Sequence, residues 1–275
     1  MSIGLRMKGL NSSIHHQRRA QDHHPNSPSM ADSIHISLVD DPSDFEAIFA
    51  AEMAAFAVQA QDNIWRSAHP GWEDPSTTPG FVQNRVRRWR MTTFDVHDNP
   101  NALFLKAVIP SPDGGGGADR IVGTATWVQL AADASLGDVP LDDATQLRAW
   151  RRVYPDSDAD ARFVAQALGS MQANRRATAA EKAGTAQPAW MVLDLCAVHP
   201  DFQGRGVARR LVQWGLDEAR RRGGLECTTE ASPMGRRVYD KLGFARGPEI
   251  EYFVDEDLKD RPIPSNMFMR TGGFS

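Results

Sequence analysis

A buried strand that runs into a glycine turn and then into a long amphipathic helix constrains the fold of this chain most strongly. Residues 190–198 are apolar apart from Asp194, which is typical of a central strand covered on both faces. Glycines follow at positions 204 and 206, and apolar side chains then recur on one helical face from residue 208 to residue 219. This succession of strand, tight turn and helix indicates an α/β fold.

Hydrophobic periodicity predicts a mixed architecture along the rest of the chain. Further strands are expected at 34–38, 102–109, 121–130, 225–230, 245–254 and 266–271. Further helices are expected at 45–56, 82–90 and 233–242. Ser43 and Glu46 form a capping-box pair before the first of these helices, and Ser232 is a suitable N-cap for the last. Residues 60–80, with five prolines and glycines, are expected to form a loop.

The distribution of apolar residues predicts one folded domain with a tail and an insertion. A length of 275 residues suits one large domain or two small ones. Residues 1–33 hold almost no large apolar side chains, so we expect a disordered tail there. Residues 131–187 predict two helices but too few apolar residues for a separate core. We therefore expect a single domain at 34–275 that includes this helical insertion, and a flexible hairpin connection at the four glycines 114–117.

The composition argues against several classes of protein. Lys and Arg number 31 against 35 Asp and Glu, and this net charge of -4 disfavours a nucleic-acid-binding surface, despite four arginines between 85 and 90. No apolar run approaches the roughly 18 residues of a membrane span. The two cysteines, Cys196 and Cys227, lack the spacing of a disulfide framework or a zinc site, and no cluster of His, Asp and Glu predicts a metal.

The turn between the central strand and the long helix has the chemistry of an anion site. Free backbone amides at the start of a helix point outward, and the helix dipole adds partial positive charge. Gly204 and Gly206 would let a pyrophosphate approach the backbone, and Arg205 adds a mobile positive charge. The turn lacks the glycine pattern of a dinucleotide site and the Gly-Lys-Ser/Thr of a nucleotide-hydrolysing loop. A tight turn that binds nothing is the alternative for this segment taken alone.

Three motifs in this part of the chain resemble the GNAT acetyltransferase superfamily. The residues QGRGVA at 203–208 are similar to its Gln/Arg-x-x-Gly-x-Gly/Ala signature. Before them, LCAVHP at 195–200 resembles the fourth strand of that family and its exit. After them, YDKLGF at 239–244 resembles the end of its fourth helix. The earlier elements also fit, so the resemblance spans about 34–271, and the chain as a whole resembles fungal members of the superfamily.

The resemblance implies an α/β domain of GNAT type, with a mixed, mostly antiparallel central sheet flanked by helices. The helical insertion would lie between the third and fourth strands. The resemblance also implies an acyl-CoA-dependent N-acetyltransferase that uses acetyl-CoA as co-substrate and no metal. The pantetheine arm would pair with the fourth strand, and the pyrophosphate would lie on the amides of the glycine turn. The cofactor-binding residues implied in this way are Cys196, Ala197, Val198, Gln203, Gly204, Arg205, Gly206, Val207, Ala208 and Ser232.

Acetylation of an amine needs a polarised thioester carbonyl, an uncharged amine and a proton for the leaving thiolate. The resemblance implies that the backbone amide of Val198 polarises the carbonyl and that Tyr239 is the general acid, in a direct transfer within a ternary complex. Asp194 is the one ionisable side chain within the buried strand. A carboxylate there either relays a proton or binds the amine, or it is a structural carboxylate paired with Arg87 or Arg88.

Further candidates concern the acceptor side. Strand alternation would place Asp194 on the same face as Cys196. Glu230, just before the last helix, is a candidate amine-binding residue. Trp65 and Trp72 either wall an aromatic acceptor pocket or anchor their own loop.

The sequence leaves the acceptor itself open. The leading hypothesis is a primary amine of a small molecule. The alternatives are a protein lysine or N-terminal acetyltransferase, and a non-catalytic acyl-CoA-binding module; the presence of both Tyr239 and Asp194 argues against the module. We expect a monomer or homodimer with no nucleic-acid or membrane partner. We also expect a location in the cytoplasm or nucleus, while the slightly basic residues 1–33 leave an organelle address open.

Overall fold

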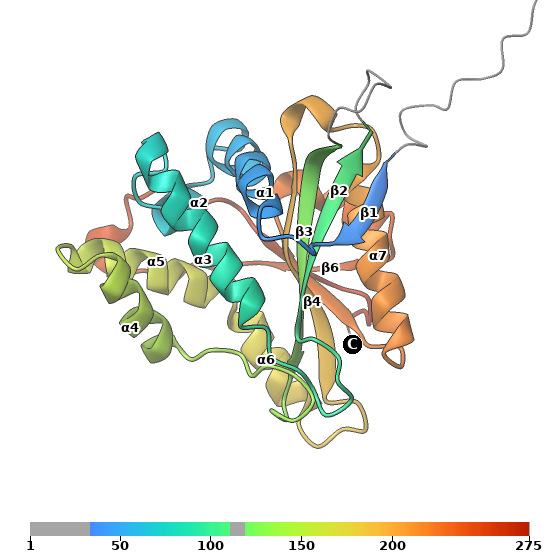
Figure 1. Cartoon of the computed structure of the whole chain (residues 1–275). Coiled ribbons are helices and arrows are strands. Elements are labelled where there is room, and N and C mark those ends of the chain that lie inside the picture. Colours follow the sequence, from blue (N-terminus) through green and yellow to red (C-terminus); the bar gives the residue numbers. More distant parts are fainter. Residues whose placement is uncertain (1–33, 111–118, 275) are drawn as a thin grey trace, which may run out of the picture.

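The structure is a computed structural model that describes residues 34–110 and 119–274 (Figure 1). The tail expected at 1–33 and the glycines at 114–117 lie outside these described residues. Where it is described, the chain forms a seven-stranded sheet with helices on both faces. This is the mixed α/β architecture that the sequence predicts.

The sheet contains one parallel pair of strands. The strands are β1 His35–Leu38, β2 Ala102–Ile109, β3 Arg120–Ala131, β4 Ala189–Val198, β5 Cys227–Ala231, β6 Ala245–Glu249 and β7 Met267–Arg270. Their order across the sheet is β1-β2-β3-β4-β5-β7-β6. Among these strands β4 and β5 run parallel, and every other neighbouring pair is antiparallel. A parallel pair needs a long crossover, and the glycine turn with its helix supplies it.

Helices cover both faces of this sheet (Figure 1). They are α1 Asp44–Glu52, α2 Asn63–Ala68, α3 Thr78–Arg90, α4 Asp143–Val153, α5 Asp158–Met171, α6 Ala173–Lys182, α7 Val207–Arg221 and α8 Pro233–Asp240. Helix α1 continues directly into a π-helical segment, Met53–Gln59. Phe45 of α1 and Val82 of α3 pack with Phe104 on one face of the sheet. Helix α7 packs against the other face, where the main core lies.

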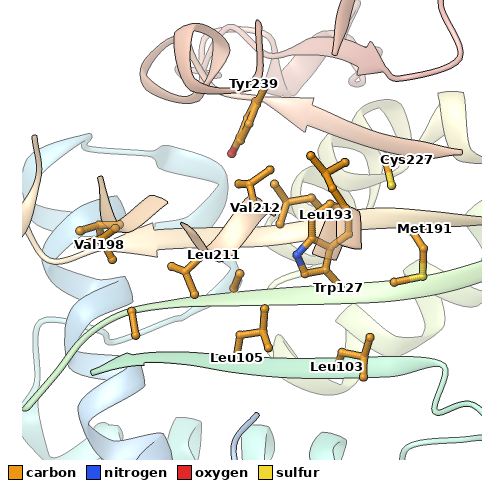
Figure 2. Packing of buried hydrophobic residues seen from close by; sticks show 14 of the residues in the cluster. Leu103, Leu105, Trp127, Met191, Leu193, Val198, Leu211, Val212, Cys227 and Tyr239 are labelled. Carbon is orange, nitrogen blue, oxygen red and sulfur yellow. The ribbon is translucent and has the colours of Figure 1, made fainter. Parts of the chain in front are cut away.

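The main core is centred on Trp127 of β3 (Figure 2). This tryptophan is fully buried and lies among Leu193, Leu211 and Val212. A Cβ atom on Gly215 of α7 would lie 1.9 Å from the Trp127 ring. The missing side chain at this position therefore allows the helix to approach the sheet closely enough to cover the tryptophan.

Strand β4 has an irregularity at Asp194, at the centre of the sheet. Leu193 is opposite Trp127 and Leu195 is opposite Thr126, so Asp194 has no partner of its own on β3. Such a bulge interrupts the alternation of side chains. As a result, the common face expected for Asp194 and Cys196 is not found: Asp194 forms ion pairs with helices α3 and α6, whereas Cys196 packs against the main core.

The insertion at 131–187 lies between β3 and β4, as expected, but it forms three helices, α4 to α6, and not two. Phe163 of α5 is fully buried and packs with Leu258 of the segment between β6 and β7. The Tyr154 hydroxyl donates a hydrogen bond to the carbonyl of Ser67 on α2. The insertion therefore shares its apolar contacts with the rest of the fold.

Two local expectations are wrong. The Ser43 side chain does not cap α1; its hydroxyl donates to Asp41 instead. The loop expected at 60–80 contains α2, whose N-cap Asp62 accepts a hydrogen bond from the Trp65 amide. The prolines and glycines that signalled a loop all lie at 70–80, after this helix has ended.

Candidate active site

A cavity of about 810 Å³ lies between the second half of β4, the glycine turn and α8. The π-helical segment and residues 264–265 complete its walls. The cavity brings together nearly all the residues that the sequence singled out for acyl-donor binding, and Tyr239 with them. The predicted residues that line it are Cys196, Ala197, Val198, Gln203, Gly204, Gly206, Val207, Ala208, Ser232 and Tyr239. Arg205 is the exception, because its guanidinium lies over the Phe202 ring, 5.2 Å from the ring centroid.

The glycine turn presents its backbone to this cavity. Gly204 and Gly206 have φ angles of +74° and +82°, in the left-handed region that favours glycine, and a Cβ at either position would meet open space. Helix α7 starts directly after Gly206, so the unpaired amides of its first turn lie at the same wall. The Gln203 side-chain amide donates to the Val198 carbonyl at 3.0 Å and to the Gln59 side chain at 2.8 Å. The result is an anchored, open backbone cradle that fits a pyrophosphate.

Tyr239 of α8 brings a phenol to the cavity. Its side chain is 8% exposed, and Figure 2 shows the hydroxyl directed from the helix toward the strands. A Cβ on Gly235, one turn earlier, would lie 2.6 Å from the tyrosine ring, so glycine makes room for it. Burial, and then the nearby Cys196 thiol, raise the pKa of Tyr239 well above its usual value. The phenol is therefore protonated at neutral pH and able to donate to a sulfur or oxygen atom.

Asp194 and Glu230 do not line the cavity, because both belong to a buried ion-pair cluster. Asp194 pairs through one oxygen with Arg88 at 2.9 Å and through the other with Arg175 at 2.8 Å. Glu230 pairs with the same Arg175 at 2.6 Å. Burial alone would raise the pKa of Asp194, but Arg175 and Arg88 outweigh burial and lower it.

This cluster bears on the two interpretations of Asp194. A carboxylate with both oxygens engaged by guanidinium groups is a weak base, so the geometry favours a structural carboxylate. Of the two partners considered for it, Arg88 is in contact. Arg175 was not anticipated from the sequence, because it comes from α6, a helix without a clear apolar period.

The two tryptophans lie away from the large cavity. Trp65 is buried, stacks on His69 with ring centroids 4.0 Å apart, and borders a separate cavity of about 280 Å³ between α1, α3 and the sheet. Trp72 lies under the Arg66 guanidinium, which is 5.2 Å from the ring centroid. Trp65 therefore belongs to the wall of the smaller cavity, and Trp72 packs within its own segment.

Sequence reasoning missed Asp62, a carboxylate that does line the large cavity, as Phe56 does. Its backbone position is fixed because it is the N-cap of α2, with an oxygen 2.9 Å from the Trp65 amide nitrogen. Burial raises the pKa of Asp62. The signal that was available is an Asp two residues before the apolar pair Ile64 and Trp65, which is the pattern of a helix start.

Within 34–110 and 119–274, no three or more His, Cys, Asp or Glu side chains are grouped so that they could hold a metal ion. None of the helices in these same segments is long and apolar enough to cross a membrane.

Comparison with known proteins adds a family and a set of related folds. The profile of the acetyltransferase (GNAT) family matches residues 119–244, which run from β3 to just beyond α8 and include most of the cavity wall. No curated protein matches this sequence.

Solved structures of N-acetyltransferases share the fold at low sequence identity. A variant of an agmatine N-acetyltransferase in its apo form has a TM-score of 0.56 at 13% identity, covering 87% of this chain and 99% of its own. A polyamine N-acetyltransferase of Drosophila melanogaster that forms N-acetylagmatine has a TM-score of 0.53 at 14% identity, covering 86% of this chain and 97% of its own. Arylalkylamine N-acetyltransferase 2 of Aedes aegypti has a TM-score of 0.53 at 16% identity, also covering 86% of this chain and 97% of its own. These likenesses show the fold, and the matching profile identifies residues 119–244 as a GNAT acetyltransferase domain.

Proposed function

We propose that this protein is an N-acetyltransferase that moves the acetyl group of acetyl-CoA to the primary amine of a small molecule. One observation carries the proposal. A single cavity joins the glycine turn of α7, which suits a pyrophosphate, to the phenol of Tyr239, which suits a leaving thiolate. The match of residues 119–244 to the GNAT acetyltransferase profile supports acyl transfer as the reaction.

Backbone groups would hold the acyl donor. β4 pairs with β3 as far as Val198 but with β5 only at 191–193, so the second half of β4 has one open edge. An extended chain that carries amides, such as pantetheine, is able to hydrogen-bond to such an edge in the manner of an added strand. The residues proposed to bind the donor are Cys196, Ala197, Val198, Gln203, Gly204, Gly206, Val207, Ala208 and Ser232. Arg205, outside the lining, would add positive charge beside the turn.

The proposed reaction forms a C–N bond between the amine and the acetyl carbon and breaks the C–S bond of the thioester. The Val198 amide would polarise the carbonyl, and Tyr239 would give its proton to the departing sulfur. The ammonium ion of the acceptor would lose one proton to solvent before it attacks. Asp62 would accept the second proton as the C–N bond forms, and solvent would return one to the phenolate. Burial raises the pKa of Cys196 to about 12, so this thiol stays neutral. Direct transfer is therefore favoured over an acyl-enzyme on Cys196.

The acceptor side of the cavity favours a cationic amine. Asp62 supplies a carboxylate there, and the ring of Phe56 supplies an aromatic surface. Both groups attract an ammonium ion. The names of the structural neighbours refer to agmatine, polyamines and arylalkylamines, and these small amines are the first acceptors to test.

The test combines binding and turnover on the full chain. Calorimetry measures acetyl-CoA binding, and thiol release measures transfer to agmatine, spermidine, tryptamine or a lysine peptide. Gly206→Glu places a negative charge on the turn, and we expect it to weaken acetyl-CoA binding by about 100-fold or more. Gly223→Glu is the matched control, because Gly223 has a φ of +94° at the other end of α7 and lies outside the cavity lining.

Each outcome separates the alternatives. Turnover with one small-amine class would name the acceptor, and turnover with the lysine peptide alone would favour a protein acetyltransferase. Binding of acetyl-CoA without turnover of any amine would favour a binding module. A wild-type protein that does not bind acetyl-CoA would contradict the proposal.

A further inference from the structure

The point where β4 and β5 stop pairing is bridged by a side chain from the helical insertion. Leu193 and Thr229 are the last paired residues of the two strands. The next residue on each strand is acidic, Asp194 on β4 and Glu230 on β5. Arg175 of α6 contacts both carboxylates and so joins the two strands at the place where their backbone hydrogen bonds end.

The contacts of Arg175 use three nitrogens of its guanidinium group. Nη1 donates to Oδ1 of Asp194 at 2.8 Å, while Nη2 and Nε donate to the two oxygens of Glu230 at 2.6 and 3.1 Å. The pair with Glu230 is bidentate, which fixes its orientation as well as its distance. The Arg175 side chain is only 7% exposed and that of Glu230 only 3%. Arg88 of α3, a half-exposed side chain, meets the second oxygen of Asp194 at 2.9 Å, so two cations balance the two carboxylates.

The position of this bridge matters for the cavity. Two residues beyond Asp194, β4 reaches Cys196 at the cavity wall. Two residues beyond Glu230, the chain reaches Ser232, the N-cap of the helix that carries Tyr239. A rigid bridge between the two strands at this point therefore sets the spacing of the two opposite walls.

We propose that Arg175 is a positioning residue for acetyl transfer, which holds β4 and β5 at a fixed separation. It thereby places the open edge of β4 and the Tyr239 phenol at reacting distance from each other. This inference rests on the proposed N-acetyltransferase function. It gives the insertion at 131–187 a role in the site through a residue that touches neither substrate.

Three variants test this role. Arg175→Met removes the charge and the hydrogen-bond donors. Arg175→Lys keeps the charge but loses the planar guanidinium group that binds a carboxylate with two nitrogens. Arg176→Met is the control on the same helix, because Arg176 is 31% exposed and pairs with Asp143 at 3.2 Å. We expect kcat to fall about 100-fold in Arg175→Met and about 10-fold in Arg175→Lys, and to stay near the wild-type value in Arg176→Met. KM for the amine and Kd for acetyl-CoA should change by less than about threefold, because the glycine turn and Asp62 are untouched.

Backbone hydrogen exchange on the same variants gives a readout that needs no turnover. We expect faster exchange at 195–198 and 231–232 in Arg175→Met, and not in Arg176→Met. If Arg175→Met matched the Arg176→Met control in both kcat and exchange, the inference would be overturned. Should Arg175→Met fail to fold, a lysine variant with wild-type kcat would overturn it as well. A wild-type protein without turnover would contradict the proposed function. Hydrogen exchange in Arg175→Met would then decide by itself whether Arg175 holds β4 and β5 together.

Discussion

At the scale of single residues, the partners of each carboxylate decide what it is able to do. The sequence leaves Asp194 as a proton relay, an amine-binding group or a structural carboxylate, and in the structure two guanidinium groups engage both of its oxygens. Asp62 accepts a backbone hydrogen bond and lines the cavity, and burial raises its pKa. Of these two groups, Asp62 is therefore the better proton acceptor.

The role of Asp62 is tested by its isosteric amide. We expect Asp62→Asn to lower kcat/KM for the amine about 100-fold, because the side chain no longer attracts an ammonium ion or accepts its proton. Asp74→Asn is the control, since Asp74 is also an N-cap, for the turn at Pro75–Thr77, and does not line the cavity. Equal activity of the two variants in a thiol-release assay would contradict the role of Asp62.

His69 should make the stability of the fold depend on pH. Burial, and then the charge of Arg85, lower its pKa from 6.5 to about 4. Because the folded value lies below the unfolded one, the unfolded chain binds the proton first as the pH falls. The stabilisation is therefore complete above about pH 6.5 and is lost as the pH falls toward 4. Between these limits the free energy of unfolding should drop by about 3 kcal/mol more in the wild type than in His69→Gln. Parallel pH profiles of the two proteins in urea titrations would contradict this.

At the scale of elements, the contact of α7 with the sheet depends on one glycine. We expect Gly215→Ala to destabilise the fold by about 3 kcal/mol, because the new methyl group would collide with Trp127. Gly80→Ala in α3 is the control, because a Cβ there has no neighbour within 4 Å and alanine favours a helix by up to about 1 kcal/mol. Thermal unfolding of the two variants measures the difference, and a Gly215→Ala variant as stable as the wild type would contradict the packing described.

The elements that were predictable from the sequence are those with a local signal. The strand at 190–198, the glycine turn and the helix after it show a clear change of hydrophobic period, and they form β4 and α7 as expected. Helix α6 has no such period, so neither the helix nor the arrival of Arg175 at β4 and β5 was foreseeable. The bulge at Asp194 is set by pairing with β3 and cannot be read from β4 alone. Most of the predicted donor-binding residues follow this local signal, and they line the cavity. Asp62 has only the weaker pattern of a helix start and was not predicted.

At the scale of the whole molecule, we propose that the insertion and the sheet form one cooperative domain over residues 34–275. Trp150 and Phe163 of the insertion share an apolar cluster with Leu258, which lies after β6. Arg175 adds a buried polar contact to the same interface. We expect one urea transition with the same midpoint by two probes. Circular dichroism follows the whole fold, and the difference in fluorescence between the wild type and Trp150→Phe follows Trp150 of the insertion. Two separate transitions would contradict a single domain.

The central claim is that one cavity binds acetyl-CoA and presents Tyr239 to its thioester. The most direct measurement is the rate of thiol release with the best acceptor amine for the wild type, Tyr239→Phe and Tyr154→Phe. Tyr154 is the matched control, because its hydroxyl donates to the Ser67 carbonyl away from the cavity. We predict that kcat falls about 100- to 1000-fold in Tyr239→Phe, with acetyl-CoA still bound, and stays near the wild-type value in Tyr154→Phe. A Tyr239→Phe protein that releases thiol as fast as the wild type would contradict the account.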